Sequence, residues 1–186
     1  MAELTVSGGT HPILKDDYAS EWMGIEVLAL DDGHATIRMT LRQEMLNGFG
    51  MAHGGMIFAF GDTAFALACN PASGKPGEAG IDSGTITVAS GVDINFLKPA
   101  FRGQVLTAIA NRRASTGRSG LYDVQIYAAD PGAGAPSAPQ PAPAGSVPTA
   151  TVPGELPTDP ATGAAAAHQS ELIAEFRGRS RTISKK

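Results

Sequence analysis

The chain is 186 residues long, with 17% charged and 42% hydrophobic side chains and a formal net charge of −4 at pH 7. This length suits one domain with one sizeable core, and the acidic balance argues against a nucleic-acid partner. The single cysteine, Cys69, excludes an internal disulfide and a cysteine-based metal cluster, and its apolar neighbours predict a buried thiol. Without a secretory leader or an apolar run of membrane-span length, we expect a cytoplasmic protein that makes no membrane contact.

The first predicted elements are a short helix and a β-hairpin. Residues 12–23 place apolar side chains at mixed spacings of three and four, with acids early, as an amphipathic helix does. Residues 24–30 are typical of a strand, and the sequence DDG at 31–33 is a strong turn signal. In residues 34–41 apolar and polar side chains alternate, which predicts a second strand with one buried face.

The middle of the chain is predicted to hold one long buried helix. Residues 42–53 show no regular period and contain several turn-forming residues, so we expect an ordered loop there. Residues 54–70 are apolar almost all round, with Asp62 as the single acid, and such a segment is typical of a helix enclosed by other elements. Pro71 then stops its continuation.

Four further strands complete the chain, three before an unusual insertion and one after it. The predicted strands are residues 85–96, 104–114, 120–129 and 171–183. Residues 131–167 are rich in proline, carry almost no charge and contain no aromatic side chain, so we expect a disordered insertion inside a single domain, residues 1–186. This order of elements predicts an α+β fold in which an antiparallel β-sheet wraps around one long central α-helix.

Three features of residues 46–70 point to chemistry. The sequence HGG at 53–55 opens the predicted helix, where backbone N–H groups and the helix dipole suit an oxyanion. Asp62 is a carboxylate in an apolar helix, where an unpaired charge is costly, and Asn47 offers an amide that can hold a water or a carbonyl. Each of these residues also has a structural interpretation. On that interpretation the glycines only let the helix approach another backbone closely, and Asp62 pairs with a buried partner. His53 then positions the loop through a hydrogen bond, and Asn47 forms a simple turn.

The spacing of two of these residues predicts an oligomer. Gly54 and Asp62 are eight residues apart, which is about 12 Å along a helix at about 1.5 Å per residue. One small group therefore cannot touch both residues of the same helix. If both act on one substrate, two copies of the helix must pack antiparallel across a two-fold axis, so a catalytic role requires a homodimer with two equivalent sites.

The motifs together resemble a known family. HGGMIFAFGDTAFALACN at 53–70, preceded by Asn47-Gly48 and followed by INFLKPA at 94–100, is similar to the phenylacetic-acid-degradation branch of the hotdog-fold thioesterases. That branch contains the hydroxyphenylacetyl-CoA thioesterase, and the resemblance covers nearly all of residues 11–129 and 171–183. It implies a hotdog fold and a homodimer or dimer of dimers (a homotetramer), with the active site at the subunit interface.

The resemblance also implies roles for residues of the helix and of the loop before it. Asp62 corresponds to the carboxylate that acts as general base on water or as nucleophile, and Gly54 to the glycine whose N–H polarises the thioester carbonyl. Asn47 corresponds to the residue that orients the water or the carbonyl. The supporting positions are His53, Gly55 and Thr63, the last as a possible holder of water. Members that use a serine or threonine at the start of the third strand would find Thr85, Thr87 or Ser90 there.

For coenzyme A, the resemblance implies phosphate contacts with basic residues of the later strands. The candidates are Lys98, Arg112, Arg113 and Arg118, with Asn95 and Ser90 beside them. The alternative for the basic residues is an ordinary solvated face. Phe49, Met51 and Met56 are candidates for the acyl pocket or for ordinary core.

The expected reaction is hydrolysis of an aryl-acetyl-type CoA thioester, such as phenylacetyl-CoA or hydroxyphenylacetyl-CoA, to the free acid and coenzyme A. It needs no metal and no cofactor, since coenzyme A belongs to the substrate. Two alternatives remain open. One is a hotdog dehydratase or hydratase acting on acyl thioesters, and the other is a non-catalytic acyl-CoA sensor that binds the ester without turnover.

Overall fold

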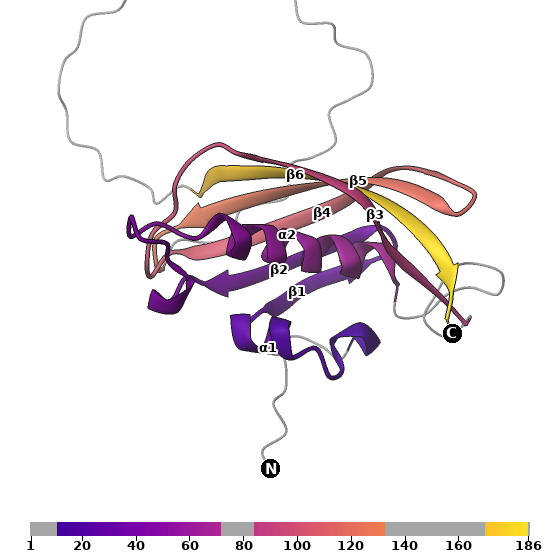
Figure 1. The fold of residues 1–186 in the computed structure, drawn as a ribbon, viewed down its shortest axis with the longest axis horizontal. Coiled ribbons are helices and arrows are strands. Elements are labelled where there is room, and N and C mark those ends of the chain that lie inside the picture. Colours follow the sequence, from indigo (N-terminus) through magenta and orange to yellow (C-terminus); the bar gives the residue numbers. More distant parts are fainter. Residues whose placement is uncertain (1–10, 72–83, 133–169, 186) are drawn as a thin grey trace, which may run out of the picture.

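The computed structural model describes residues 11–71, 84–132 and 170–185. Two helices and six strands follow one another along the chain (Figure 1). The helices are α1 (Tyr18–Met23) and α2 (Gly54–Cys69), and short 3₁₀ turns cover Pro12–Leu14 and Gln43–Met45. The strands are β1 (Glu26–Asp31), β2 (His34–Thr40), β3 (Thr85–Phe96), β4 (Val105–Thr116), β5 (Ser119–Ala129) and β6 (Glu171–Ser184).

All six strands form one antiparallel sheet in the order β1-β2-β4-β5-β6-β3. The sheet curves around α2, which lies across its concave face, while α1 lies beside the β1 end (Figure 1). This is the predicted arrangement of an antiparallel sheet around one long helix. β1 and β3 are the two edges, and β5 and β6 are paired neighbours whose register ends at Ala128 and Glu171.

Two glycines let α2 lie close to the sheet. A Cβ at Gly61 of α2 would lie 3.1 Å from side-chain carbons of Ile126 and Phe176. A Cβ at Gly178 of β6 would lie 2.6 Å from the ring of Phe65, closer than real packing allows. The core between helix and sheet is therefore built from large side chains that meet bare backbone on the opposite element.

The N-terminal segment differs from the single helix predicted for residues 12–23. Asp16 has a left-handed backbone with φ 63°, which interrupts a right-handed helix after the first 3₁₀ turn. The carboxylate of Asp17 then caps α1 by accepting the backbone N–H of Ser20 at 3.1 Å. Gly24, with φ 70°, ends α1.

The remaining predicted elements are present with shifted ends. β4 and β5 reach to Thr116 and Ser119, so their hairpin turn is only two residues long, and the expected loop 42–53 contains one 3₁₀ turn. The predicted insertion at 131–167 falls almost entirely on residues 133–169, which lie outside the described residues. Among the described helices, neither is long and apolar enough to cross a membrane.

Candidate active site

His53 forms the N-cap of α2. Its Nδ1 accepts the backbone N–H of Gly55 at 3.0 Å, and its carbonyl accepts the N–H groups of Met56 and Ile57 at 2.8 and 3.3 Å. A helix leaves its first four N–H groups without intrahelical partners, and His53 thus satisfies three of them. Among the described residues, the N–H of Gly54 is the first-turn donor of α2 that has no acceptor.

The absence of a side chain at Gly54 keeps this donor accessible. A Cβ there would lie 3.2 Å from the Phe96 ring, which stands at the end of β3 and is half exposed. A free N–H at the positive end of a 16-residue helix is a suitable donor for a developing oxyanion. Gly55, by contrast, has its N–H directed to His53, so its contribution is to fix the cap.

Asp62 lies on the same outward face of α2. It is half-buried, and among the described residues its carboxylate has no ion pair and no hydrogen bond, whereas seven other pairs of charged side chains form salt bridges. Burial raises the pKa of Asp62 above its usual value. A half-buried carboxylate with a raised pKa and without a structural partner is the kind of group that serves as a base or nucleophile.

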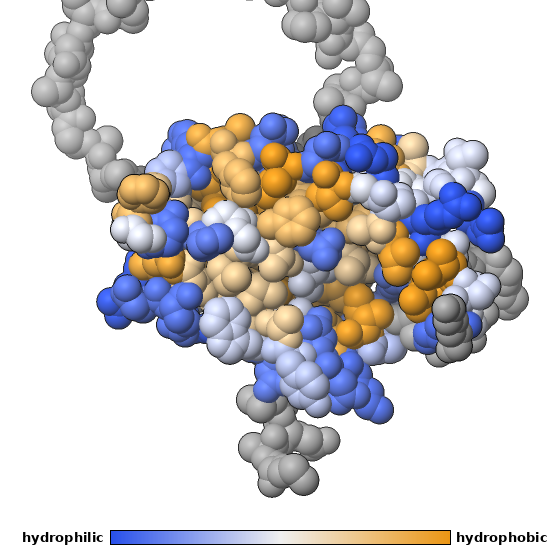
Figure 2. Space-filling model, viewed as in Figure 1, coloured by the Kyte–Doolittle hydropathy of each residue, from blue (hydrophilic) through white to orange (hydrophobic). Residues whose placement is uncertain are grey.

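One chain does not bring Gly54 and Asp62 together. Both lie on α2 with two helical turns between them, about 12 Å at about 1.5 Å per residue. Phe58 lies midway between them, is 38% exposed and shares their face. The surface over α2 and β3 is largely apolar (Figure 2). The separation of Gly54 and Asp62 along α2 is therefore the one predicted from the sequence, and one small group can contact both only if two copies of the chain contribute.

Asn47 organises the loop that leads into α2. Its side-chain oxygen accepts the backbone N–H groups of Phe49 at 2.9 Å and Met51 at 3.3 Å, and its own N–H donates to the Met51 carbonyl at 2.8 Å. The oxygen is thus occupied by the turn, and within the described part of the chain the amide N–H₂ group makes no hydrogen bond. Asn47 therefore presents a donor, not an acceptor, to any group bound nearby.

The Thr63 side chain is engaged with α1. Its hydroxyl donates to the Ala59 carbonyl at 3.1 Å and lies 3.4 Å from the Ser20 hydroxyl of α1. The Ser20 hydroxyl in turn donates to Asp17 at 2.7 Å. These contacts connect the two helices, and they direct the Thr63 hydroxyl toward α1.

The predicted coenzyme A residues are dispersed over the sheet. Lys98 pairs with Glu171, and its backbone N–H donates to the Ile173 carbonyl near the start of β6. Arg118 lies at the opposite end, where its carbonyl accepts the N–H of Thr182. Nine residues of β6 separate these points, about 30 Å at about 3.3 Å per residue, so one chain cannot bring both cations to one phosphate.

The other basic and polar candidates are engaged in pairs on the sheet. Arg112 holds Asp32 through two hydrogen bonds of 2.8 and 2.7 Å, and Arg113 pairs with Asp123 at 3.3 Å. Asn95 is exposed on β3 opposite Glu175, and the Ser90 hydroxyl donates to the Arg179 carbonyl at 3.0 Å. Of the strand hydroxyls, Thr87 pairs with Thr182 at 2.9 Å and its N–H donates to the Asn70 side chain at 2.8 Å, while Thr85 begins β3.

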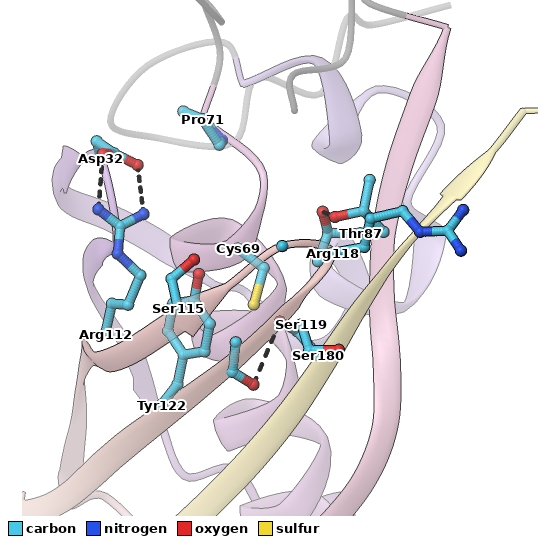
Figure 3. Close-up of a pocket in the computed structure, with 13 residues that line it drawn as sticks. Asp32, Cys69, Pro71, Thr87, Arg112, Ser115, Arg118, Ser119, Tyr122 and Ser180 are labelled. Atoms are coloured by element: carbon cyan, nitrogen blue, oxygen red, sulfur yellow. Dashed lines mark hydrogen bonds and ion pairs between the residues drawn. The ribbon is translucent and has the colours of Figure 1, made fainter. Parts of the chain in front are cut away.

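A cavity of about 390 Å³ at the C-terminal end of α2 was not predicted from the sequence. Its lining comes from α2, the β1–β2 turn and strands β3 to β6, and it includes Cys69, Arg112 and Tyr122 (Figure 3). These lining residues are far apart in the sequence, so no motif or regular spacing indicates that they form one cavity. Thr87, Arg112 and Arg118, which the sequence singled out as site candidates, also line the cavity, and Cys69 is buried as predicted.

Comparison with known proteins agrees with this fold. The Thioesterase superfamily model matches residues 49–135. The acyl-coenzyme A thioesterase PaaI of Escherichia coli (strain K12) is 38% identical over 116 residues, covering 62% of this chain and 75% of that protein. A putative esterase of Archaeoglobus fulgidus is 30% identical over 112 residues, covering 60% of this chain and 66% of that protein. The solved structure of E. coli PaaI, from the phenylacetic acid degradation operon, matches with a TM-score of 0.63 and 28% identity, covering 95% of this chain and 91% of that one.

An antiparallel sheet around one helix, with a free N–H at the helix start and a carboxylate on its outer face, defines a hotdog-fold thioester hydrolase. The chain belongs to the thioesterase superfamily and is a homologue of PaaI. The resemblance stated from the motifs is thereby confirmed.

Proposed function

We propose that this protein hydrolyses aryl-acetyl CoA thioesters, such as phenylacetyl-CoA or hydroxyphenylacetyl-CoA, to the free acid and coenzyme A. The observation that carries this proposal is the pair formed by the free Gly54 N–H and the unpartnered carboxylate of Asp62 on one helix face. PaaI, the similar protein from the phenylacetic acid degradation operon, is named as an acyl-coenzyme A thioesterase, which supports the substrate class.

In the proposed reaction the thioester carbonyl oxygen accepts the Gly54 N–H, and the helix dipole favours the negative charge that develops there. Asp62 takes a proton from water, whose oxygen bonds to the carbonyl carbon, or it attacks that carbon to form an anhydride that water then hydrolyses to the free acid and Asp62. In both routes the carbon–sulfur bond breaks, and coenzyme A leaves as the thiol after taking up a proton. In this proposal the Asn47 amide donates a hydrogen bond to the water or the carbonyl, and water is the co-substrate.

The site is completed in this proposal by a second copy of the chain. If Gly54 of one copy lies beside Asp62 of the other, the two-fold axis passes midway between them, at Phe58. Phe58 is 38% exposed, and the adjoining edge carries Val88, Phe96 and Leu97, which are also exposed. Such an apolar surface is typical of an interface between subunits.

The same antiparallel arrangement resolves the separation of the cationic residues. It turns the Gly54 end of one copy, where Lys98 lies, toward the Cys69 end of the other copy, where Arg118 lies. Cations that are about 30 Å apart in one chain at about 3.3 Å per strand residue then approach one substrate from two chains. We therefore propose Lys98 and Arg118, from different copies, as the phosphate contacts of coenzyme A.

The test is release of free thiol from a panel of acyl-CoA esters by the wild type, by Asp62→Asn and by Asp130→Asn. Asp130 is an exposed carboxylate outside α2 that accepts a hydrogen bond from Gln104, so its variant controls for the loss of a surface carboxylate. We expect the wild type and the control to hydrolyse aryl-acetyl esters and Asp62→Asn to lose activity. Ester binding without thiol release by the wild type would instead indicate a sensor, and hydration of an enoyl-CoA would indicate a hydratase.

A further inference from the structure

A linked group of polar side chains lies on the convex face of the sheet, which α2 does not cover (Figure 1). Alternate side chains of β2 are buried toward α2, so His34, Thr36, Arg38 and Thr40 share the opposite face. In the strand register His34 is opposite Asn111 of β4. His34, Thr36 and Asn111 are each half-buried, and the hydrolysis proposed above uses none of them.

Two hydrogen bonds hold the His34 ring. Its Nδ1 atom lies 2.8 Å from the Asn111 Oδ1 atom, and its Nε2 atom lies 3.1 Å from the Thr36 hydroxyl oxygen. Because an amide oxygen only accepts hydrogen bonds, the ring carries its hydrogen at Nδ1. Nε2 of the neutral imidazole is then the acceptor, and the Thr36 hydroxyl donates to it. Asn111 therefore sets both the tautomer and the orientation of His34.

These three groups follow one another in the order of a nucleophile, its base and the group that orients the base. Both distances lie within the range of about 2.6–3.2 Å in which a base can take the proton of a nucleophile. The strands that carry the groups are paired without interruption from His34 to Thr40, so the geometry is held by the sheet and not by a loop. Thr36 is thus a hydroxyl with a base already oriented toward it.

Arg38 supplies positive charge next to this group. It is the next outward-facing residue of β2 after Thr36, about 7 Å along the strand at about 3.3 Å per residue. Its Nε and Nη2 atoms both lie 2.7 Å from one carboxylate oxygen of Glu26, which leaves its Nη1 group, within the described part of the chain, for a second acceptor. A negative charge that develops beside Thr36 is therefore within reach of the Arg38 side chain.

We propose that Thr36, His34 and Asn111 form a second acyl-transfer centre, separate from α2, in which the Thr36 hydroxyl accepts an acyl group. The Thr36 oxygen bonds to the acyl carbon while its proton passes to Nε2 of His34. The bond from that carbon to the leaving group breaks, the leaving group departs with the bonding electrons, and His34 returns the proton to it or to solvent. Water then attacks the new ester, and its proton passes through His34 to the departing Thr36 oxygen.

The position of this centre defines the class of acyl donor that it takes. Its face of the sheet also carries the exposed residues Arg38 and Thr40, so an open surface surrounds Thr36 and little binding energy is available to orient a large substrate. The donor must therefore be reactive by itself, with a small acyl group on a leaving group that is stable as an anion. Aryl esters such as p-nitrophenyl acetate belong to this class.

The experiment incubates the folded full-length chain with p-nitrophenyl acetate, follows p-nitrophenolate by its absorbance and locates the acetyl group by peptide mass spectrometry after an early acid quench. We expect the wild type to carry acetyl on Thr36. Thr36→Val keeps the β-branched shape and should carry none at this position. His34→Gln removes the base and should slow acetylation of Thr36 about 100-fold, since a general base contributes about 10²–10⁴ in rate.

Matched variants separate this centre from ordinary surface hydroxyls and from α2. Thr40→Val removes a hydroxyl from the same face, about 20 Å from His34 at about 3.3 Å per residue, and should leave the acetylation of Thr36 unchanged. Asn111→Ala should slow this acetylation and Asn111→Asp should restore it, because a carboxylate accepts the same ring N–H. Repeating the series with Asp62→Asn removes release at α2 from the absorbance signal.

Two results would overturn the proposal. One is a folded wild type with neither acetyl on Thr36 nor any p-nitrophenolate release that Thr36→Val removes. The other is a His34→Gln variant that acetylates Thr36 at the wild-type rate, because Thr36 is then an ordinary exposed hydroxyl. Neither result bears on the hydrolysis of CoA thioesters, so this centre and the function proposed for α2 stand or fall separately.

Discussion

The Nδ1 atom of His53 accepts the backbone N–H of Gly55 at 3.0 Å, and this one hydrogen bond assigns the two glycines at the start of α2 to different tasks. The N–H of Gly55 is used inside the protein, while the N–H of Gly54 has no acceptor among the described residues and is the donor that we propose for the substrate. The bond also gives His53 a capping role, in which its ring acts as an acceptor at Nδ1. A histidine whose Nδ1 atom accepts this hydrogen bond is unsuited to act as the general base.

We predict that His53→Ala lowers the free energy of unfolding by about 1 kcal/mol, the usual effect of losing a helix N-cap, and also reduces activity. His53→Asn is the informative comparison, because asparagine is among the best N-cap residues. It should restore most of the stability and activity. Urea denaturation and thiol release measure both. Full stability with no activity in His53→Asn would show that the imidazole has a chemical role beyond capping, whereas no recovery of stability would contradict the capping role.

The second prediction concerns the stability of Asp62→Asn. The pKa of Asp62 is raised in the folded state, so folding favours its protonated form, and the charged form at neutral pH lowers stability. Replacing the carboxylate with a neutral amide should therefore abolish hydrolysis while leaving the melting temperature at pH 7 equal to or above that of the wild type. A clear fall in melting temperature would show that Asp62 serves the fold.

The third prediction is the pH dependence of hydrolysis. Asp62 must be ionised to act, and burial raises its pKa above the ordinary value of 3.8. The acidic limb of the kcat/KM profile should therefore have a midpoint above 3.8, with activity lost as pH falls through it. Rates from about pH 3 to pH 8 on one ester, with enzyme that stays folded across this range, would measure this midpoint. A limb at or below the ordinary value would show that Asp62 does not control the rate.

The fourth prediction tests the apolar face of α2. Because Phe58 lies midway between Gly54 and Asp62, Phe58→Glu should place two like charges at the two-fold axis and yield monomers. Activity should fall with dissociation, since one chain alone separates the two groups. Leu28→Glu, an exposed position on β1 at the other edge of the sheet, is the matched control. Sedimentation velocity distinguishes the species, and an active Phe58→Glu monomer would contradict the shared site.

The fifth prediction concerns stability in mild acid. His11 is buried, and this burial lowers its pKa, although the backbone of Asn70 opposes the shift. The unfolded chain then takes up a proton near pH 6.5 while the folded chain does not, so the stabilising contribution is present above pH 6.5 and is lost below it. His11→Gln should show a smaller loss of unfolding free energy between pH 7 and 5 than the wild type. Equal losses of unfolding free energy in His11→Gln and the wild type would contradict this prediction.

Much of the fold follows from local patterns. Apolar and polar side chains alternate in β2, which predicts a strand, and the long apolar segment of α2 predicts a buried helix. Gly33 marks the hairpin turn. The break at Asp16 did not follow, because a left-handed aspartate is stabilised by its surroundings and leaves no periodic trace.

The candidate site, like the fold, could be predicted only in part. Gly54, Asp62 and the cap at His53 lie within one segment, so their relation could be deduced from helix geometry. Thr63 follows Asp62 in the sequence, and a step of one residue turns the helix by about 100°, so its hydroxyl contacts Ser20 of α1, while its role in holding water stays a prediction. Cys69 and Tyr122 share a cavity only because of how the strands pair around α2, which a single sequence does not display.

Ala128 at the end of β5 pairs with Glu171 at the start of β6, and this pairing determines how the segment between the two strands can be engineered. Adjacent antiparallel strands place the end of one beside the start of the next, so the sheet itself fixes no length for the segment that joins them. The cost of a longer connection grows only with the logarithm of its length. The junction between β5 and β6 is therefore a natural attachment point, where a tag, a reporter domain or a shortened turn can replace residues 133–169 without altering strand register.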